Sequence, residues 1–195
     1  MSGRLYAVLE AVDSLNSKDP NTELFEGNQW PRERLYSERM SSRLAEFCPN
    51  ASEELQISVR AQHVQRWQSK RVDYPAGKAG YYRWRTELGK MHATIATDLM
   101  RNEGYSEESI SRVQKLLTKQ GIKLDSEVQA LEDVACLVFL EYYFLAFAAK
   151  HEQDKVIDVV RKTWSKMSAE GQSAARALPL STGALAMLNK ALSDD

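Results

Sequence analysis

Apolar residues recur every three to four positions along most of this chain, which is the spacing of amphipathic helices. The pattern predicts helices over residues 5–17, 31–47, 52–67, 81–102, 106–120, 126–149, 156–167 and 178–192. No stretch alternates with the period of two that marks a half-buried strand. We therefore predict an all-α fold, a bundle of about seven to nine helices.

Proline, glycine and small polar residues separate these helices. Polar stretches over 16–31 and 69–80 both contain proline and glycine and are predicted loops. Ser52 and Ser106 precede predicted helices and are placed to cap them. The span 126–149 is apolar on nearly all sides, which predicts a central, buried helix.

The length and composition favour one domain with its own core. The chain has 195 residues, of which 43% are hydrophobic. Within a single domain over 1–195, we expect a core from 31 to 150 followed by C-terminal helices from 151 to 195. The net charge of −1 gives no overall signal for nucleic acid or for an anionic membrane surface.

The cysteines and the apolar segments indicate a cytoplasmic protein. Cys48 and Cys136 form no Cys-x-x-Cys pair, and unpaired thiols fit a reducing compartment. The first twenty residues lack the apolar core of a signal peptide. The longest apolar stretch, 134–149, is interrupted by Glu141 and is too short to span a bilayer, so no membrane partner is expected.

Positive charge is concentrated between Arg60 and Lys90, where eight basic residues accompany two acidic ones. Tyrosines and tryptophans are interleaved with them, as in surfaces that bind phosphate groups or bases. The alternative is an ordinary solvated surface. The predicted substrate-binding residues are Arg60, Arg66, Trp67, Arg71, Lys78, Tyr81, Arg83, Trp84 and Arg85.

A second set of residues suggests a metal site inside the bundle. Different predicted helices carry Glu38, His63, His92 and the pair Glu132–Asp133. Imidazoles and carboxylates that meet in a bundle core can bind a divalent transition metal. The carboxylate pair interrupts an apolar segment, so at least one of its members must be paired or ligating. The plainer alternative is that these histidines are satisfied in the core and the carboxylates are solvated.

Long motifs of the chain resemble a known family. The segments that carry the resemblance are RMSSRLAEFCPNASEELQISVRAQHVQRWQSKRVDYPAGKAGYYRWR, HATIATDLM, LEDVACLVFLEYYF and KTWSKMS. They closely resemble the domain-of-unknown-function family 4202, and the resemblance runs over most of the chain. It implies no particular activity. No Walker A, GxGxxG, HExxH or GxSxG motif is found in the sequence.

The order of elements also resembles, more distantly, the HD-domain metal-dependent phosphohydrolases. Those helical proteins bind metal through a first His, a His-Asp pair and a later Asp. Here Glu38 stands in the place of the first ligand, and His63 is followed by Val64 where the aspartate would be. His92 opens a following segment, and Asp133 lies in the apolar helix where the last ligand is found.

That resemblance implies a metal-dependent phosphohydrolase acting on a small phosphorylated or nucleotide substrate. One divalent ion (Mn, Fe, Zn or Mg) would be held by Glu38, His63, His92 and Asp133 and would activate a water. Glu132 is the candidate for orienting a ligand or acting as general base, and the predicted catalytic residues are Glu132 and Asp133. Two alternatives stay open: binding of an anionic metabolite or RNA without turnover, and an oligomer contact through the basic stretch.

Overall fold

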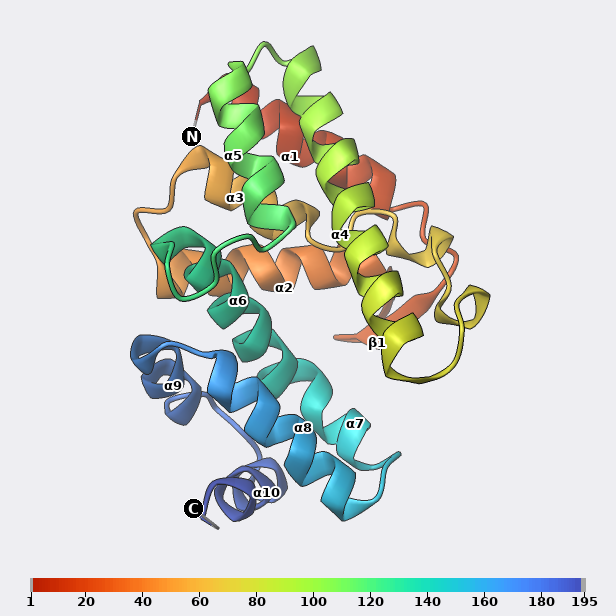
Figure 1. Ribbon diagram of the computed structural model, residues 1–195, viewed down its shortest axis with the longest axis vertical. Coiled ribbons are helices and arrows are strands. Elements are labelled where there is room, and N and C mark those ends of the chain that lie inside the picture. The colour runs from red at the N-terminus through yellow and green to blue at the C-terminus, as the bar shows by residue number, and fades with distance from the viewer. Residues whose placement is uncertain (1, 194–195) are drawn as a thin grey trace. The chain divides into compact units, whose positions relative to one another are not determined.

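Helices make up nearly all of the regular structure of residues 2–193, which a computed structural model describes, and the predicted all-α fold is confirmed (Figure 1). Tertiary contacts divide the chain into a first unit, Met1–Gly121, and a second unit, Ile122–Asp195. The expected division after residue 150 does not coincide with this one, because the helices from residue 126 onward pack mainly on one another.

The first unit contains four longer helices, α1, α2, α4 and α5, and several shorter elements. Their bounds are α1 (Gly3–Asn16), β1 (Thr22–Phe25), β2 (Asn28–Pro31), α2 (Arg32–Phe47), α3 (Glu53–Ala61), the 3-10 turns η1 (Arg66–Gln68) and η2 (Arg71–Asp73), α4 (Gly77–Asn102) and α5 (Glu107–Leu117). The predicted caps are confirmed, since the hydroxyls of Ser52 and Ser106 accept backbone N–H bonds at the starts of α3 and α5. Helices α4 and α5 lie side by side (Figure 1).

A single apolar core holds α1, α3, α4 and α5 together. Each of these helices contributes the residues that its 3.6-residue period places on one face. The buried residues are Leu5, Val8, Val12, Ile57, Ala61, Val64, Ala93, Ala96, Met100, Tyr105, Ile110, Val113 and Leu117.

A short antiparallel hairpin occupies the predicted loop over 16–31, which the sequence pattern did not predict. Strands β1 and β2 pair with Phe25 opposite Asn28. The two residues between them, Glu26 and Gly27, both have positive φ, as a tight two-residue hairpin turn requires. Each strand has four residues, so the alternation is too brief to be recognised.

Helix α3 ends at Ala61, earlier than the predicted end at residue 67. After a turn over residues 62–65, Gln65 adopts a left-handed conformation with φ of 53°, so the α-helix cannot run through it to residue 67. Its backbone N–H donates to Oδ1 of Asn16, a fully buried side chain of α1, at 3.0 Å. A tertiary hydrogen bond therefore ends the helical segment that the apolar pattern would have continued.

The loop before α4 folds back onto that helix. Trp84 donates its indole N–H to the carbonyl of Ser69 at 3.1 Å. A Cβ atom at Gly80 would lie 1.9 Å from the carbonyl oxygen of Pro75, so only glycine allows this close approach. Helix α4 consequently begins at Gly77 rather than at the predicted Tyr81.

The second unit is helical throughout its described part. Its elements are α6 (Ser126–Val138), the π-helical turn η3 (Phe139–Tyr143), α7 (Phe144–Ala148), α8 (Gln153–Lys166), α9 (Ala169–Arg176) and α10 (Thr182–Leu192). The predicted helix over 126–149 is therefore interrupted by a π turn, and α9 was not predicted. No helix within residues 2–193 has the length and apolar character needed to cross a membrane.

A buried ion-pair network joins the first three helices of the first unit. Arg60 of α3 donates from Nε and Nη2 to the two carboxylate oxygens of Asp13 in α1, both at 2.6 Å. Its two Nη groups donate to the two oxygens of Glu38 in α2, both at 2.8 Å. Arg34 of α2 pairs with the same two carboxylates. One guanidinium thus connects three helices with bidentate geometry.

We expect loss of Arg60 to destabilise the first unit strongly. An Arg60→Met variant keeps the apolar stem but leaves a buried carboxylate without its main partner, which costs about 3–5 kcal/mol. Arg101→Met, which removes an exposed pair with Asp98, is the matched control and should cost about 0–1 kcal/mol. Urea unfolding followed by circular dichroism measures both, and equal losses in the two variants would contradict the role given to Arg60.

Candidate functional site

His63 lies at the centre of a chain of hydrogen bonds in the first unit. Its Nδ1 lies 3.1 Å from Oε2 of Glu33 in the first turn of α2. Nη1 of Arg66, at the start of η1, lies 2.6 Å from its Nε2. A guanidinium has only donors, so Nε2 accepts, and the neutral imidazole carries its proton on Nδ1 and donates it to Glu33. Tyr36 stacks on the ring at a centroid distance of 4.0 Å.

Two buried polar side chains from the N-terminal region, Asn16 and Asp19, hold the backbone at Gln65 and at Glu33, on either side of His63. Asn16 accepts from the backbone of Gln65, beside His63, and donates to the carbonyl of Glu33 at 3.4 Å. Pro31 offers no side-chain cap to α2, and Oδ2 of Asp19 accepts the backbone N–H of Glu33 at 3.0 Å instead. The carboxylate of Glu33 is therefore positioned by contacts from outside its own helix.

Helix α4 adds His92 and Arg85 to the cluster. The rings of His63 and His92 are 6.1 Å apart between centroids. His92 is only 4% exposed, and within the described chain its Nε2 has no hydrogen-bond partner. Arg85 lies two helical turns before His92 on the same face, and its charge lowers the pKa of both histidines. No hydrogen bond or ion pair of Arg85 is formed within residues 2–193.

Burial and positive charge determine the protonation of this cluster. Burial, with the charges of Arg66 and Arg85, lowers the pKa of His92 to about 3. Burial and the charge of Arg66 also hold the pKa of His63 well below its usual 6.5. Burial raises the pKa of Glu33 to about 7, although Arg66 opposes that rise. At neutral pH both imidazoles are uncharged, and the positive charge of the site comes from the arginines.

Aromatic side chains continue outward from Arg66. The guanidinium lies over the ring of Trp84, with its Cζ 5.0 Å from the ring centroid. Trp84 is buried, whereas Tyr81, one turn earlier on α4, has a ring 6.0 Å from Trp84 and is 45% exposed. Arg66, Trp84 and Tyr81 therefore follow one another from a buried guanidinium to an exposed ring.

Arg60, a predicted substrate-binding residue, does not join this cluster. Asp13 and Glu38 occupy its Nε and both of its Nη groups, and its side chain is buried. Because a phosphate would have to displace two bidentate carboxylates, Arg60 serves the fold rather than a ligand. The basic pattern of the sequence could not reveal that Arg60 points toward α1 and α2.

The remaining predicted residues surround η1, η2 and the start of α4. Arg71 donates to two backbone carbonyls of its own loop. Arg83 is exposed and donates from Nε to Glu87 at 2.8 Å. Lys78 is exposed and Trp67 is half-buried. The structure therefore joins only Arg66, Tyr81, Trp84 and Arg85 of the predicted binding residues to the two histidines.

Glu38, a predicted metal ligand, lies in the ion-pair network. Burial alone would raise the pKa of Glu38, but the hydrogen bonds and charges of Arg60 and Arg34 lower it. Both of its oxygens receive bonds from these arginines. The carboxylate is therefore charged and already paired.

Asp133 and Glu132 belong to the second unit, where both are buried. Asp133 accepts from the backbone N–H and the hydroxyl of Ser168, at 2.9 and 2.6 Å, and so anchors the start of α9. A Cβ atom at Gly171 would lie 2.5 Å from Oδ1 of Asp133, so the glycine makes room for the carboxylate. Nζ of Lys166 lies 3.8 Å from Glu132. The expectation that a carboxylate of this pair must be paired is confirmed.

As arranged, the predicted donors do not fit a metal ion. No group of three His, Cys, Asp or Glu side chains in the described part of the chain could hold one. Both ring nitrogens of His63 form hydrogen bonds, so neither is available to bind a metal. Nε2 of His92 has no hydrogen-bond partner within the described chain and is the available ligand atom. Val64 is fully buried in the apolar core, where an aspartate would be costly. The metal centre stays a prediction that metal analysis of the protein would test.

The sequence pattern missed Glu33 and Tyr36, the residues that hold His63. A signal for Glu33 was present, because residues 33, 37, 40 and 44 form one buried stripe of α2. A glutamate on such a stripe must find a partner. Glu38 lies off this stripe.

The family comparison matches most of the chain. The sequence model described as "Domain of unknown function (DUF4202)" covers residues 6–188. No curated protein and no solved structure matches the chain, so the likeness to HD-domain phosphohydrolases stays a prediction.

We expect Glu33 to make stability fall as pH rises. Its folded pKa of about 7 lies above the ordinary 4.5, so the folded state holds this proton more tightly than the unfolded state. The contribution is fully present below pH 4.5 and is lost as pH rises through 7, by about 3 kcal/mol in total. Glu33→Gln should therefore gain stability relative to wild type between pH 5 and pH 8. Urea unfolding across this range measures the difference, and a difference independent of pH would contradict the prediction.

Proposed function

The chain belongs to the DUF4202 family, and from its geometry we propose that it binds a small phosphorylated anion at Arg66, Arg85 and His92. The proposed function is binding, and the proposal does not require that the ligand be hydrolysed.

The single observation that carries this proposal is the lack of a carboxylate partner for two clustered arginines. Arg34, Arg39 and Arg60 each form an ion pair with a carboxylate. Arg66 and Arg85 form none within residues 2–193, although burial lowers the pKa of Arg66 and the charge of Arg85 lowers it further. Two like charges in a partly buried setting are costly without a counter-ion, and an anionic ligand would supply it.

His92 supports the same conclusion independently. Buried polar nitrogens are almost always hydrogen-bonded, and the rare exceptions call for an explanation. Nε2 of His92 is such an exception, and it lies in the field of both arginines. A bound phosphate, which offers oxygen acceptors and at neutral pH can also carry a proton, would complete its hydrogen bonding.

The neighbouring aromatic rings favour a phosphorylated compound that also carries a ring. Tyr81 is half-exposed beside Trp84, and Arg66 lies against Trp84. A base or other planar group linked to the phosphate could stack on Tyr81. A single-stranded RNA segment would use the same contacts and is the alternative ligand.

We expect replacement of either arginine to weaken phosphate binding. Charge-assisted hydrogen bonds contribute about 1.5–3 kcal/mol, so Arg66→Gln and Arg85→Gln should each lower affinity roughly 10- to 100-fold. Isothermal titration calorimetry with inorganic phosphate, and with a ribose phosphate, measures the change. Arg101 lies on α4, as Arg85 does, but is paired with Asp98. Arg101→Gln is therefore the matched control and should bind phosphate as wild type does. Unchanged affinity in both Arg66 and Arg85 variants would refute the site.

The HD-domain resemblance implies a further step, in which the bound phosphorylated compound is hydrolysed with the help of a metal ion. The donors do not fit a metal as they stand, so we expect phosphate affinity to be unchanged by a chelator. Metal content of the purified protein and phosphate release from a nucleotide with added manganese test this version directly. Bound metal, or turnover lost in His63→Ala and His92→Ala, would favour hydrolysis over simple binding.

A further inference from the structure

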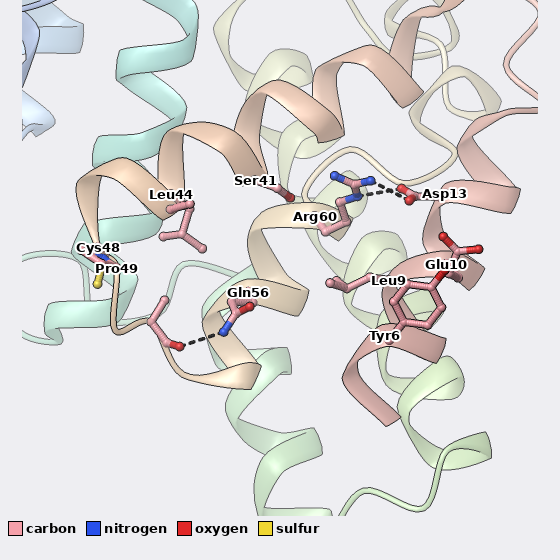
Figure 2. Close-up of a pocket in the computed structure, with 12 residues that line it drawn as sticks. Tyr6, Leu9, Glu10, Asp13, Ser41, Leu44, Cys48, Pro49, Gln56 and Arg60 are labelled. Carbon is pink, nitrogen blue, oxygen red and sulfur yellow. Dashed lines mark hydrogen bonds and ion pairs between the residues drawn. The ribbon is translucent and has the colours of Figure 1, made fainter. Parts of the chain in front are cut away.

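A pocket of the first unit is lined in part by Asp13 and Arg60 of the ion-pair network. It has a volume of about 340 Å³, which is within the range of small-ligand pockets. Residues of α1, of the C-terminal half of α2 and of α3 form its walls. Cys48 and Pro49 lie toward one end, and Glu10 and Asp13 lie toward the other (Figure 2).

Most of the wall is apolar. Its apolar side chains come from α1, from α2 and from the loop before α3: Tyr6, Leu9, Leu44, Ala45, Pro49 and Ala51. Leu9 projects between the helices in the view of Figure 2, between Arg60 and Tyr6. A ligand in this pocket would therefore need an apolar body.

The polar groups of the pocket offer acceptors and negative charge. Arg60 is the one cation among the described lining residues, and its Nε and Nη groups bond to Asp13 and Glu38. Glu10 is exposed at the pocket and forms no ion pair within the described chain. Gln56 donates from Nε2 to the carbonyl of Ala51 at 2.9 Å (Figure 2), which leaves its Oε1 as an acceptor. Two carboxylates and one guanidinium line the pocket, so the lining charge is −1.

We propose that this pocket binds a small organic cation, an ammonium group on an apolar ring or short chain. The apolar body would lie between Leu9 and Leu44, and the ammonium would pair with Glu10. An anion is disfavoured because it would approach Glu10, and the nearby cations, Arg34 and Arg60, are already paired with Asp13 and Glu38. The pocket is therefore separate in chemistry from the anion site, and neither proposal depends on the other.

Cys48 provides a direct measure of the charge in the pocket. Its thiol is free and half-buried, whereas the other free thiol, Cys136, is buried in the second unit. The intact protein is treated with a cationic and with an anionic methanethiosulfonate reagent, and modification of Cys48 is followed by peptide mass spectrometry. We divide the modification rate of the cationic reagent by that of the anionic reagent, and we expect this ratio to be about fivefold higher for Cys48 than for a small free thiol. Glu10→Gln should reduce this preference measurably, although Glu10 lies at the other end of the pocket, and Glu103→Gln, which changes an exposed acid at the end of α4, should leave it unchanged.

Ligand selectivity is tested with three compounds that share one ring. Phenethylammonium, phenylethanol and phenylacetate are each titrated for protection of Cys48 against neutral iodoacetamide. We expect the cation to protect at about tenfold lower concentration than the alcohol, and the anion to give no protection. Ala45 lines the pocket and is exposed, so an Ala45→Lys variant should keep its fold. Its added ammonium should repel the organic cation, and protection of Cys48 by that cation should be lost.

Two results would overturn the proposal. Equal protection by all three compounds would mean that the pocket selects only for apolar surface. Absence of protection by any compound, with Cys48 still reactive, would mean that the pocket takes no ligand of this size. Phosphate titration of the same samples reports the anion site separately, so failure of one site is distinguishable from failure of the other.

Discussion

The contact of Arg60 with Asp13 and Glu38 is the constraint on which the first unit depends. It connects α1, α2 and α3 through one buried guanidinium, and the apolar core packs α1 and α3 against α4 and α5. A buried charge of this kind tolerates few arrangements, because every donor must find an acceptor once water is removed. The network therefore sets the register of α2 against α3, and with it the position of Glu33 beside the turn that carries His63.

The arginines of the first unit divide into two groups according to their partners. Arg34, Arg39 and Arg60 are neutralised by carboxylates and hold helices or the hairpin together. Arg66 and Arg85 form no ion pair within residues 2–193 and lie among neutral imidazoles and aromatic rings, with the Glu33 carboxyl, hydrogen-bonded to His63, acting on Arg66 only through its charge. Positive charge without a carboxylate is stable only if something else compensates it, which is why the second group points to a ligand while the first explains the fold.

The same reasoning separates the observed site from the metal centre that the resemblance implied. A metal site needs several donors with free lone pairs directed at one point. Glu38 is bound by two arginines, Asp133 is bound by Ser168, and both nitrogens of His63 are engaged. Each carboxylate thus has a local structural role, and the histidines are left in a site whose charge comes from guanidinium groups.

The sequence by itself determined the helical fold, the caps at Ser52 and Ser106, and the concentration of basic and aromatic residues between Arg60 and Lys90. These depend on local periodicity and on hydrogen bonds between near neighbours, which a sequence displays directly. Tertiary structure alone decided which residues of that stretch meet. Arg60 and Arg66 are equivalent in the basic pattern, yet α3 directs one into an ion-pair network and the left-handed turn at Gln65 places the other on His63. The reason is physical: the charge and pKa of a buried group depend on partners distant in sequence, such as Asn16 and Glu33, and periodicity does not encode them.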